Sequence, residues 1–197
     1  MSKDLLIVFV KNGTLGKVKT RLAKIVGDNK ALEVYKQLVH ITKVAAKNVS
    51  AEKHVYFSEA IQEESWEGCF KSVQKGNDLG EKMLNAFDAG FLNGQEKVVL
   101  IGSDLPDISS EIIDEGFAQL ENNDVVFGPA EDGGYYFIGM KKPHEFLFKN
   151  KPWSQSELLK TTLDELGKQD VSFSLLETLN DIDTFEDFKS SKLYIDA

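Results

Sequence analysis

Short apolar runs alternate along the chain with longer segments in which apolar residues recur at helical spacing. The first run, Leu5–Val10, is continuous and rich in β-branched residues, as expected for a strand that is covered on both faces. Shorter runs predict further strands at His54–Phe57, Phe70–Val73, Val98–Ile101, Val125–Phe127 and Tyr135–Met140. Because strands and helices alternate, we expect an α/β fold, a three-layer α/β/α sandwich with a mostly parallel central sheet.

The helical segments carry start and stop signals. Helices are expected from near Val18, from Asp28 through Ala45, over Leu79–Phe91, and from Ser110 to Leu120. Asp28 can act as the N-cap of its helix. A serine or threonine followed three residues later by an acid resembles a capping box, and this pattern occurs at Ser154/Glu157 and at Thr184/Asp187. The first should open a helix that stops near Gly167, and the second a helix near the C-terminus.

The composition favours a single domain over residues 1–197. Hydrophobic residues make up 42% of the chain, and no internal repeat, low-complexity tract or linker interrupts it. The one cysteine, Cys69, excludes an intrachain disulfide and suggests a small core thiol in a reducing compartment. The N-terminal apolar run is far shorter than the ~20 residues of a membrane helix and lacks a signal-peptide cleavage pattern. We therefore expect a cytoplasmic protein without a membrane span, of undetermined oligomeric state.

The charge distribution indicates the kind of ligand. The net charge is −9, which argues against a nucleic-acid partner, since phosphate backbones attract basic surfaces. Five basic residues nevertheless lie between Lys11 and Lys24, with no acidic residue among them. An acidic protein with one concentrated basic loop suggests a small anionic ligand.

The basic loop follows the first strand directly and contains two glycines. Glycines let a backbone approach a ligand and expose N–H groups to phosphate oxygens, and lysine and arginine supply the matching charge. The candidate nucleotide-binding residues here are Lys11, Gly13, Gly16, Lys17, Lys19, Thr20 and Arg21. The spacing is neither that of a Walker A loop nor G-x-G-x-x-G. The alternative is a solvated basic turn.

An acid follows the second long apolar strand. Val98–Ile101 ends in Gly102-Ser103-Asp104-Leu105-Pro106, where the small Ser103 leaves room for a ligand and the Leu-Pro turn holds Asp104 at the sheet edge. A carboxylate in this place can bind Mg²⁺ or Mn²⁺ together with substrate phosphates. The alternative is an ordinary aspartate that starts a turn.

A second pair of acids precedes the last helix. Asp181 and Asp183 alternate on an extended segment, so their side chains should point the same way and could complete a metal site with Asp104. Alternatively, Asp183 only precedes the Thr184 cap and favours the helix dipole.

Two glycine-rich segments remain. The loop with Gly76, Asp78 and Gly80 could clamp a base or ribose, or Asp78 could simply cap the next helix. The connection after Val125–Phe127 is richer in special residues than a hairpin requires, which suggests a sugar or acceptor pocket. Its candidate residues are Asp132, Gly133, Gly134, Tyr135 and Tyr136, to which we add Pro106 and Trp153 as substrate-binding candidates.

Neither Trp153 nor the histidines point clearly to chemistry. Trp153 could stack on a ring, although core packing is the simpler explanation. His40, His54 and His144 have no metal-ligand or triad spacing, and we assign them no chemistry.

Taken together, these segments resemble the bacterial GT-A-like nucleotide-diphospho-sugar transferases of the DUF2064, or arsenosugar-biosynthesis-associated glycosyltransferase, family. The motifs of that family appear in the same order at Phe9/Lys11, Val18–Leu22, Gln74–Gly80, Gly102–Pro106, Gly128–Tyr136, Trp153-Ser154 and Asp181–Thr184. One departure is that Gly13 and Leu15 stand where the family usually has prolines. The resemblance implies that Asp104 is the metal acid and that Lys11, Lys19 and Arg21 bind phosphate.

Three functions follow as hypotheses. The first is a metal-dependent glycosyltransferase with a nucleotide-diphospho-sugar donor and a small-molecule acceptor, in which Asp104, Asp132 and Lys19 are catalytic. The second is a nucleotidyltransferase that joins an NTP to a phosphorylated acceptor and releases pyrophosphate, which the dense basic loop favours. The third is a non-catalytic nucleotide-binding module.

Overall fold

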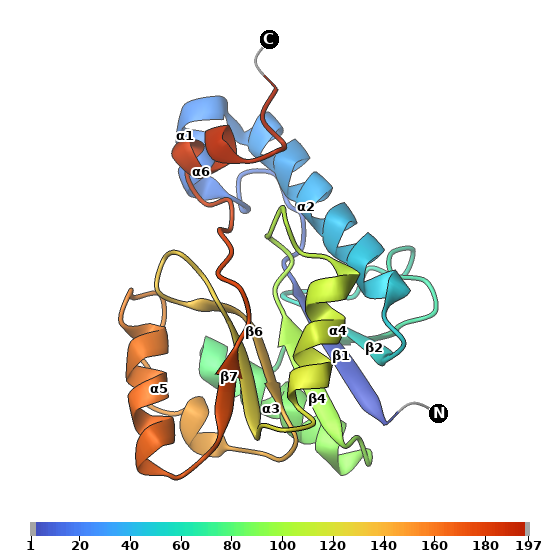
Figure 1. Ribbon diagram of the computed structural model, residues 1–197. Helices are drawn as coiled ribbons and strands as arrows, with labels where there is room; N and C mark the ends of the chain where they lie inside the picture. Colours follow the sequence, from blue (N-terminus) through green and yellow to red (C-terminus); the bar gives the residue numbers. More distant parts are fainter. Residues whose placement is uncertain (1–2, 196–197) are drawn as a thin grey trace.

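The computed structural model describes residues 3–195 and is built around a seven-stranded sheet (Figure 1). The strands are β1 (Asp4–Val10), β2 (Glu52–Phe57), β3 (Phe70–Val73), β4 (Lys97–Ile101), β5 (Val125–Pro129), β6 (Tyr135–Met140) and β7 (Phe173–Leu175). Their spatial order is β3-β2-β1-β4-β6-β5-β7. Strand β6 runs antiparallel to β4 and β5, and every other neighbouring pair is parallel. The prediction of a mostly parallel sheet is confirmed.

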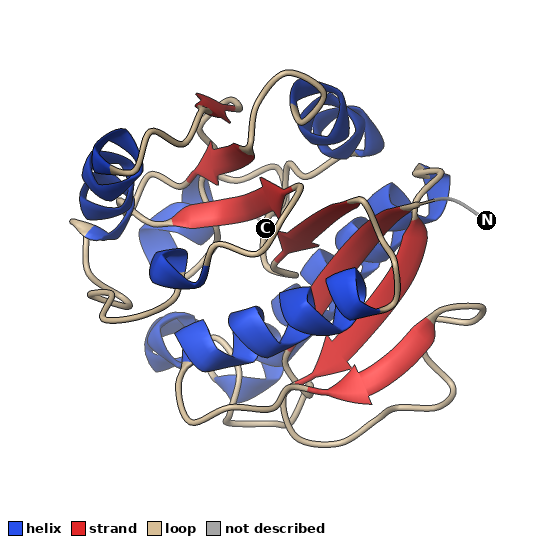
Figure 2. Ribbon diagram, turned by 90° about the horizontal axis from the view of Figure 1, so that it is seen from below, coloured by secondary structure: helices blue, strands red, loops and turns tan. Residues whose placement is uncertain are grey.

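Helices cover both faces of this sheet (Figures 1 and 2). They are α1 (Thr20–Val26), α2 (Asp28–Asn48), α3 (Leu79–Leu92), α4 (Ser110–Gln119), α5 (Leu158–Lys168) and α6 (Phe185–Ser190), with a short 3₁₀ turn at Glu145–Leu147. Helices α2 and α4 pack on one face, and α3 and α5 pack on the other. The α/β/α sandwich predicted from the alternating pattern is therefore confirmed.

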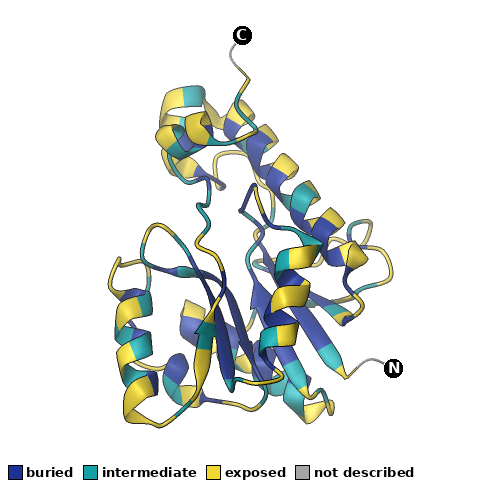
Figure 3. Cartoon of the chain, in the orientation of Figure 1, coloured by how far each residue is buried: buried dark blue, intermediate teal, exposed yellow. Residues whose placement is uncertain are grey.

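The inner strands are buried on both faces, as their apolar runs predict. Every residue from Leu5 to Val10 is buried, and Val98–Ile101 of β4 beside it is buried as well (Figure 3). Because side chains alternate along a strand, odd and even positions of β1 enter two separate apolar cores. A third, smaller core joins α1 and the start of α2 to α6 beyond the strand ends.

The helix boundaries correct three sequence predictions. Helix α5 begins at Leu158, and Ser154 adopts a left-handed conformation (φ 62°) in the turns before it, so the capping box predicted at Ser154/Glu157 is wrong. Helix α1 begins at Thr20 and not near Val18, because Lys19 is also left-handed (φ 46°). Asp28 is the first residue of α2, and Gly27 occupies the cap position. Local spacing did not reveal these left-handed residues.

The capping box at Thr184 is confirmed. Thr184 Oγ1 accepts a hydrogen bond from the backbone N–H of Asp187, and the Asp187 carboxylate accepts one from the Thr184 backbone N–H at 2.7 Å. Partial burial raises the pKa of Asp187, but the hydrogen bonds from Thr184 outweigh it and leave the pKa below its ordinary value of 3.8. The carboxylate therefore stabilises the fold above pH 3.8, and this stabilisation is lost as the pH falls through the lowered folded-state pKa.

Replacing Thr184 with alanine should lower the free energy of unfolding by about 1 kcal/mol, because one cap is lost from α6. Urea unfolding at pH 7 measures the loss, and Thr184→Ser should retain most of the stability because its hydroxyl remains. The difference between wild type and Thr184→Ala should shrink below pH 4, where Asp187 becomes protonated. An undiminished difference at low pH would contradict a role for the Asp187 carboxylate.

No helix within residues 3–195 combines the length and the apolar character needed to cross a membrane.

Candidate functional site

The basic loop leaves the end of β1 and folds back onto the protein. Two turns shape it, with the backbone N–H of Thr14 donating to Asn12 O (2.8 Å) and that of Lys17 donating to Thr14 O (3.0 Å). Gly16 has a φ of 74°, which a glycine adopts without strain. Lys11 and Lys17 are exposed, whereas Lys19 is buried. The loop is therefore more than a solvated basic turn.

The buried lysine meets the strand-end acid. Lys19 Nζ lies 3.0 Å from Asp104 Oδ2, although the two residues are 85 positions apart in sequence. The Lys19 side chain is 6% exposed and that of Asp104 33% exposed. Burial raises the pKa of Asp104, but the charge and hydrogen bond of Lys19, with the charge of Lys11, outweigh it and lower the pKa. Asp104 is thus an ionised carboxylate at neutral pH, as a metal ligand must be.

The second pair of acids comes to the same place. The backbone N–H of Ile182 donates to Asp104 O at 3.4 Å, which attaches the Asp181–Asp183 segment to the end of β4. Arg21 Nη1 lies 2.9 Å from Asp183 Oδ2. Burial, and then the negative charge of Asp104, raise the pKa of Asp181 to about 6. The charges of Asp132 and Asp183 act in the same direction, so all four acids share one electrostatic environment.

Two residues outside the predicted set hold the loop in position. Tyr35 of α2 donates from its hydroxyl to Lys11 O at 2.8 Å and lies 3.4 Å from Ser103 Oγ, so it connects the loop to the end of β4. Burial raises the pKa of the Tyr35 hydroxyl to about 12. Asn12 Oδ1 accepts a hydrogen bond from Glu59 N at 2.9 Å, which fixes the loop beside the segment after β2. A tyrosine in the apolar stripe of α2 was the only sequence signal for this role.

The Asp132–Gly134 turn is fixed against two neighbouring segments. Asp132 Oδ1 accepts from Gly134 N at 2.8 Å, and Gly133 O accepts from Leu159 N at 3.0 Å. A Cβ added to Gly133, whose φ is 87°, would lie 2.0 Å from Ser156 O, so the turn needs glycine there. On the other side, Glu131 N donates to Leu179 O, close to the Asp181 segment.

The two tyrosines after this turn do not line one pocket together, which corrects that part of the sequence interpretation. Both belong to β6, where successive side chains point to opposite faces. Tyr136 donates to Glu177 O at 3.0 Å on the α4 side of the sheet, and Tyr135 packs edge-on against Phe127 on the other side.

The Gly76–Gly80 loop has structural reasons for its composition. Asp78 accepts from Glu81 N at 2.8 Å and caps α3, which confirms the capping interpretation. A Cβ added to Gly80 would lie 2.2 Å from Phe148 O and 2.7 Å from the ring of Trp153, so Trp153 packs on α3. Pro106 is buried. Ligand binding by Gly76, Asp78, Gly80, Trp153 and Pro106 remains a prediction.

The carboxylates fit a divalent cation that is shared with a substrate. Within residues 3–195, no group of three or more His, Cys, Asp and Glu side chains is arranged to hold an ion. Mg²⁺ and Mn²⁺, however, often use one or two carboxylates and take their remaining ligands from phosphate oxygens and water. Asp104 and Asp181 supply such oxygens. Burial and, second to it, the charge of Asp104 raise the pKa of Asp181, and a cation would relieve the repulsion between the two carboxylates.

The fold and this strand-end site define a class of protein, the transferases with a nucleotide-diphospho-sugar transferase fold. The chain is 30% identical to a protein of Desulfovibrio desulfuricans G20 that is classed as a nucleotide-diphospho-sugar transferase. The similarity covers 98% of this chain and 93% of the other, with a TM-score of 0.88. A family model described as "Uncharacterized protein conserved in bacteria (DUF2064)" matches residues 40–155. The chain belongs to this DUF2064 family, and the prediction that it is a transferase is confirmed at the level of class.

More distant structures share the fold. A cytidylyltransferase from Leptospira borgpetersenii is 16% identical with a TM-score of 0.57, covering 96% of this chain and 84% of the other. The 4-diphosphocytidyl-2C-methyl-D-erythritol synthase of Anaerococcus prevotii is 13% identical with a TM-score of 0.60, covering 94% and 93%. At these identities only the fold is comparable. No curated protein matches the chain significantly.

Proposed function

We propose that the protein is a metal-dependent glycosyltransferase that uses a nucleotide-diphospho-sugar donor. The observation that carries this proposal is the contact between Lys19 and Asp104, which joins the basic loop to the strand-end acid in one site. A bound diphosphate needs the basic loop, whose cations contact its oxygens. It also needs the carboxylates, which would hold a metal ion that the diphosphate contacts as well.

The charge balance of the site favours a diphosphate over a triphosphate. Three of the four basic loop side chains already have acidic partners, since Lys17 lies 3.7 Å from Glu59, Lys19 pairs with Asp104, and Arg21 pairs with Asp183. Among the described residues, only Lys11 of this set has no ion pair within 4.0 Å. The site therefore has little excess positive charge, which suits the smaller anionic charge of a sugar diphosphate.

Each residue of the site has a distinct role in this proposal. Lys11, Lys19 and Arg21 bind and orient the diphosphate, and Tyr35 holds the loop next to Ser103. Asp104, with Asp181 and Asp183, would hold Mg²⁺ or Mn²⁺. When bound, the ion would neutralise the charge that builds on the departing nucleoside diphosphate. Asp132, one of whose carboxylate oxygens is held by Gly134 N, has a second oxygen that can accept the proton of an acceptor hydroxyl.

A nucleotidyltransferase is the second candidate. Its support is the exposed, unpaired Lys11 beside the glycine loop, which could bind an additional phosphate. The same cations would then stabilise outgoing pyrophosphate.

The products separate the two functions. Incubation with panels of sugar nucleotides and NTPs, in the presence of Mn²⁺ and candidate acceptors, should release free nucleoside diphosphate and no pyrophosphate. Pyrophosphate as the product would establish the second candidate. In parallel, a sugar nucleotide with Mn²⁺ should raise the melting temperature, because a ligand at 100 times its Kd adds about 2.7 kcal/mol of stability. If no nucleotide raises it with or without Mn²⁺, both candidate functions are wrong.

A further inference from the structure

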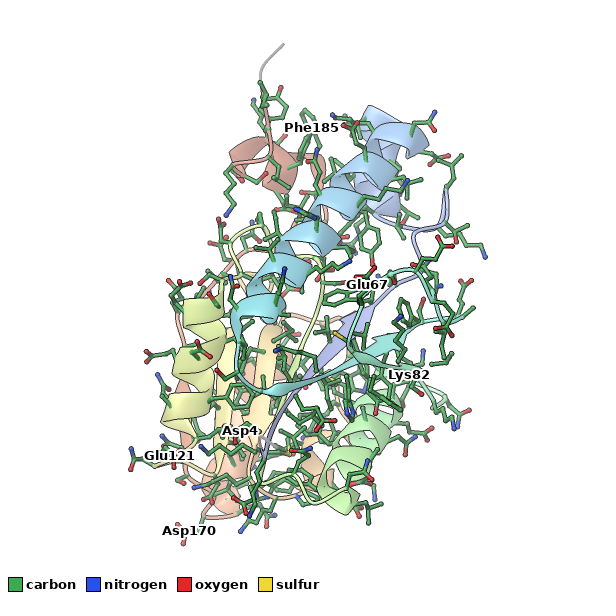
Figure 4. All side chains as sticks on the ribbon, turned by 90° about the vertical axis from the view of Figure 1, so that its right-hand side faces the viewer. Asp4, Glu67, Lys82, Glu121, Asp170 and Phe185 are labelled. Atoms are coloured by element: carbon green, nitrogen blue, oxygen red, sulfur yellow. The ribbon has the colours of Figure 1, made fainter. Side chains whose placement is uncertain are left out.

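A large cavity lies away from the acids around Asp104. It is a groove of about 890 Å³ between α3 and the edge strands β2 and β3. Its volume is in the usual range of small-molecule sites. None of its lining residues belongs to the basic loop or to the four acids. Figure 4 views the molecule from this side and labels Lys82 of α3, one of the lining residues.

The groove exists because α3 does not cover the edge of the sheet. A Cβ added to Gly90 would lie 2.8 Å from Leu5 and 3.2 Å from Val98, so α3 sits tightly over β1 and β4. The α3 side of β2 and β3 is left open. Facing it, α3 presents the small Ala86 and Ala89, which keep the groove wide.

One end of the groove holds two buried hydrogen-bonding atoms without partners. His54 is 95% buried, and its Nε2 lies 2.9 Å from Glu52 Oε1. The other oxygen of Glu52 accepts from Gln95 Nε2, also at 2.9 Å. The remaining atoms, His54 Nδ1 and Gln95 Oε1, are buried with no hydrogen-bond partner among the described residues. Leaving such atoms unpaired is costly, so each requires a partner, which is either an ordered water or a ligand in the groove.

The chemistry of these atoms specifies the partner. The hydrogen bond from His54 lowers the pKa of Glu52, which is therefore a carboxylate that accepts from Nε2. In the imidazole tautomer with its proton on Nε2, the other nitrogen, Nδ1, is an acceptor. Gln95 Oε1 is also an acceptor. A ligand at this end must therefore donate hydrogen bonds, as an amino group with two N–H bonds does.

The middle and far end of the groove add rings and charge. The rings of His54 and Phe70 lie 4.6 Å apart, Tyr56 lines the same wall, and Phe70 is exposed to stack on a flat ligand. At the far end lie Lys75 and Lys82, and neither has an ion-pair partner within 4.0 Å in the part of the chain that the structure describes. Such lysines suit a phosphate group.

We propose that this groove is a second nucleotide site, which binds a nucleoside monophosphate with an amino-bearing base. The base stacks on Phe70, its amino group donates to His54 Nδ1 and Gln95 Oε1, and the phosphate lies between Lys75 and Lys82. The site goes beyond the proposed transferase function and needs neither Asp104 nor a metal ion.

The test measures binding by calorimetry in EDTA with the Asp104→Asn variant, so that a failed transferase proposal leaves it unaffected. CMP should bind, and UMP, which has a carbonyl in place of the cytosine amino group, should bind about tenfold more weakly or worse. Phe70→Ala and Lys82→Glu should each weaken CMP about tenfold. Phe70 is exposed and Lys82 is half-buried, so the fold should tolerate both changes. The matched charge control is Lys160→Glu, at an exposed position of α5, which should leave CMP binding unchanged.

Three results would overturn the proposal. The first is absence of CMP, AMP and GMP binding. The second is that CMP, UMP and inorganic phosphate bind with equal affinity and that Phe70→Ala has no effect. The groove would then be only a nonspecific cluster of lysines. The third is a change of oligomeric state in Phe70→Ala without a change in CMP affinity, which would assign this edge to a second copy of the chain.

Discussion

Replacing Asp104 with asparagine is expected to reduce turnover of a sugar nucleotide about a thousandfold. Asparagine keeps the size of the side chain and can still contact Lys19, which lies 3.0 Å away. It removes the negative charge that a divalent cation requires, at the position where β4 ends and the basic loop meets it. Steady-state kinetics with Mn²⁺ should therefore show the loss mainly in kcat. Because the variant leaves the buried Lys19 without its anion, its free energy of unfolding should also fall, and circular dichroism must show that the variant is folded at the assay temperature.

A neighbouring aspartate provides the control. Asp107 lies three positions further on, is exposed, and pairs with Lys192 at 3.0 Å on the surface. Asp107→Asn removes the same charge from the same loop without touching the site, and it should leave kcat within twofold, since exposed pairs contribute little. Equal activity of Asp104→Asn and wild type would contradict the proposed function. Equal losses of kcat in Asp104→Asn and Asp107→Asn would show that the loss comes from the change in net charge and not from a metal site.

The succession of strands and helices along the chain and the positions of the candidate groups after strands were predictable, because both follow from local patterns. Short continuous apolar runs rich in β-branched residues, such as Leu5–Val10, are typical of strands that are covered on both faces. The carboxyl ends of parallel strands share an edge, so Asp104 and the loop from Lys11 were expected to be neighbours. The Thr184 cap was predictable for the same reason, since its partners lie within three residues.

What the sequence did not reveal depends on contacts between distant segments. The side chain of Lys19 turns inward because a left-handed residue redirects the chain just before α1, and no local spacing specifies that φ. Tyr35 follows the apolar stripe of α2 and resembles an ordinary core residue until its hydroxyl is seen beside Lys11 O. The short, half-exposed β7 (Phe173–Leu175) lacked a buried apolar run and was not predicted.

The environment of His54 in β2 also depends on contacts between distant segments and could not be predicted from the sequence. His54 has no metal-ligand or triad spacing, so the sequence assigned it no chemistry. Its interest arises from Glu52, two positions before it, and from Gln95, which reaches the same carboxylate from beyond α3. The pairing of β2 with β3 then places Phe70 opposite His54. Only the folded sheet brings these groups together around one groove.

The ion pair of Lys19 with Asp104 leads to the second large effect, which concerns stability as well as activity. Lys19→Met should lower the free energy of unfolding by about 2 kcal/mol, because it leaves a partly buried carboxylate without its cation. This value is below that of a fully buried pair, since the Asp104 side chain is 33% exposed. Lys24→Met, at an exposed position of α1, is the matched control and should change stability by less than about 0.5 kcal/mol.

The double variant Lys19→Met/Asp104→Asn separates the two contributions of this pair. With both charges removed, no unpaired carboxylate remains, so urea unfolding should recover most of the stability that Lys19→Met loses. Activity should not recover, because the double variant lacks both the lysine that binds phosphate and the carboxylate that binds the metal ion. If the stability losses of the two single variants simply added, Lys19 and Asp104 would not be coupled in solution. The site would then lack the one contact that joins its basic loop to its acids.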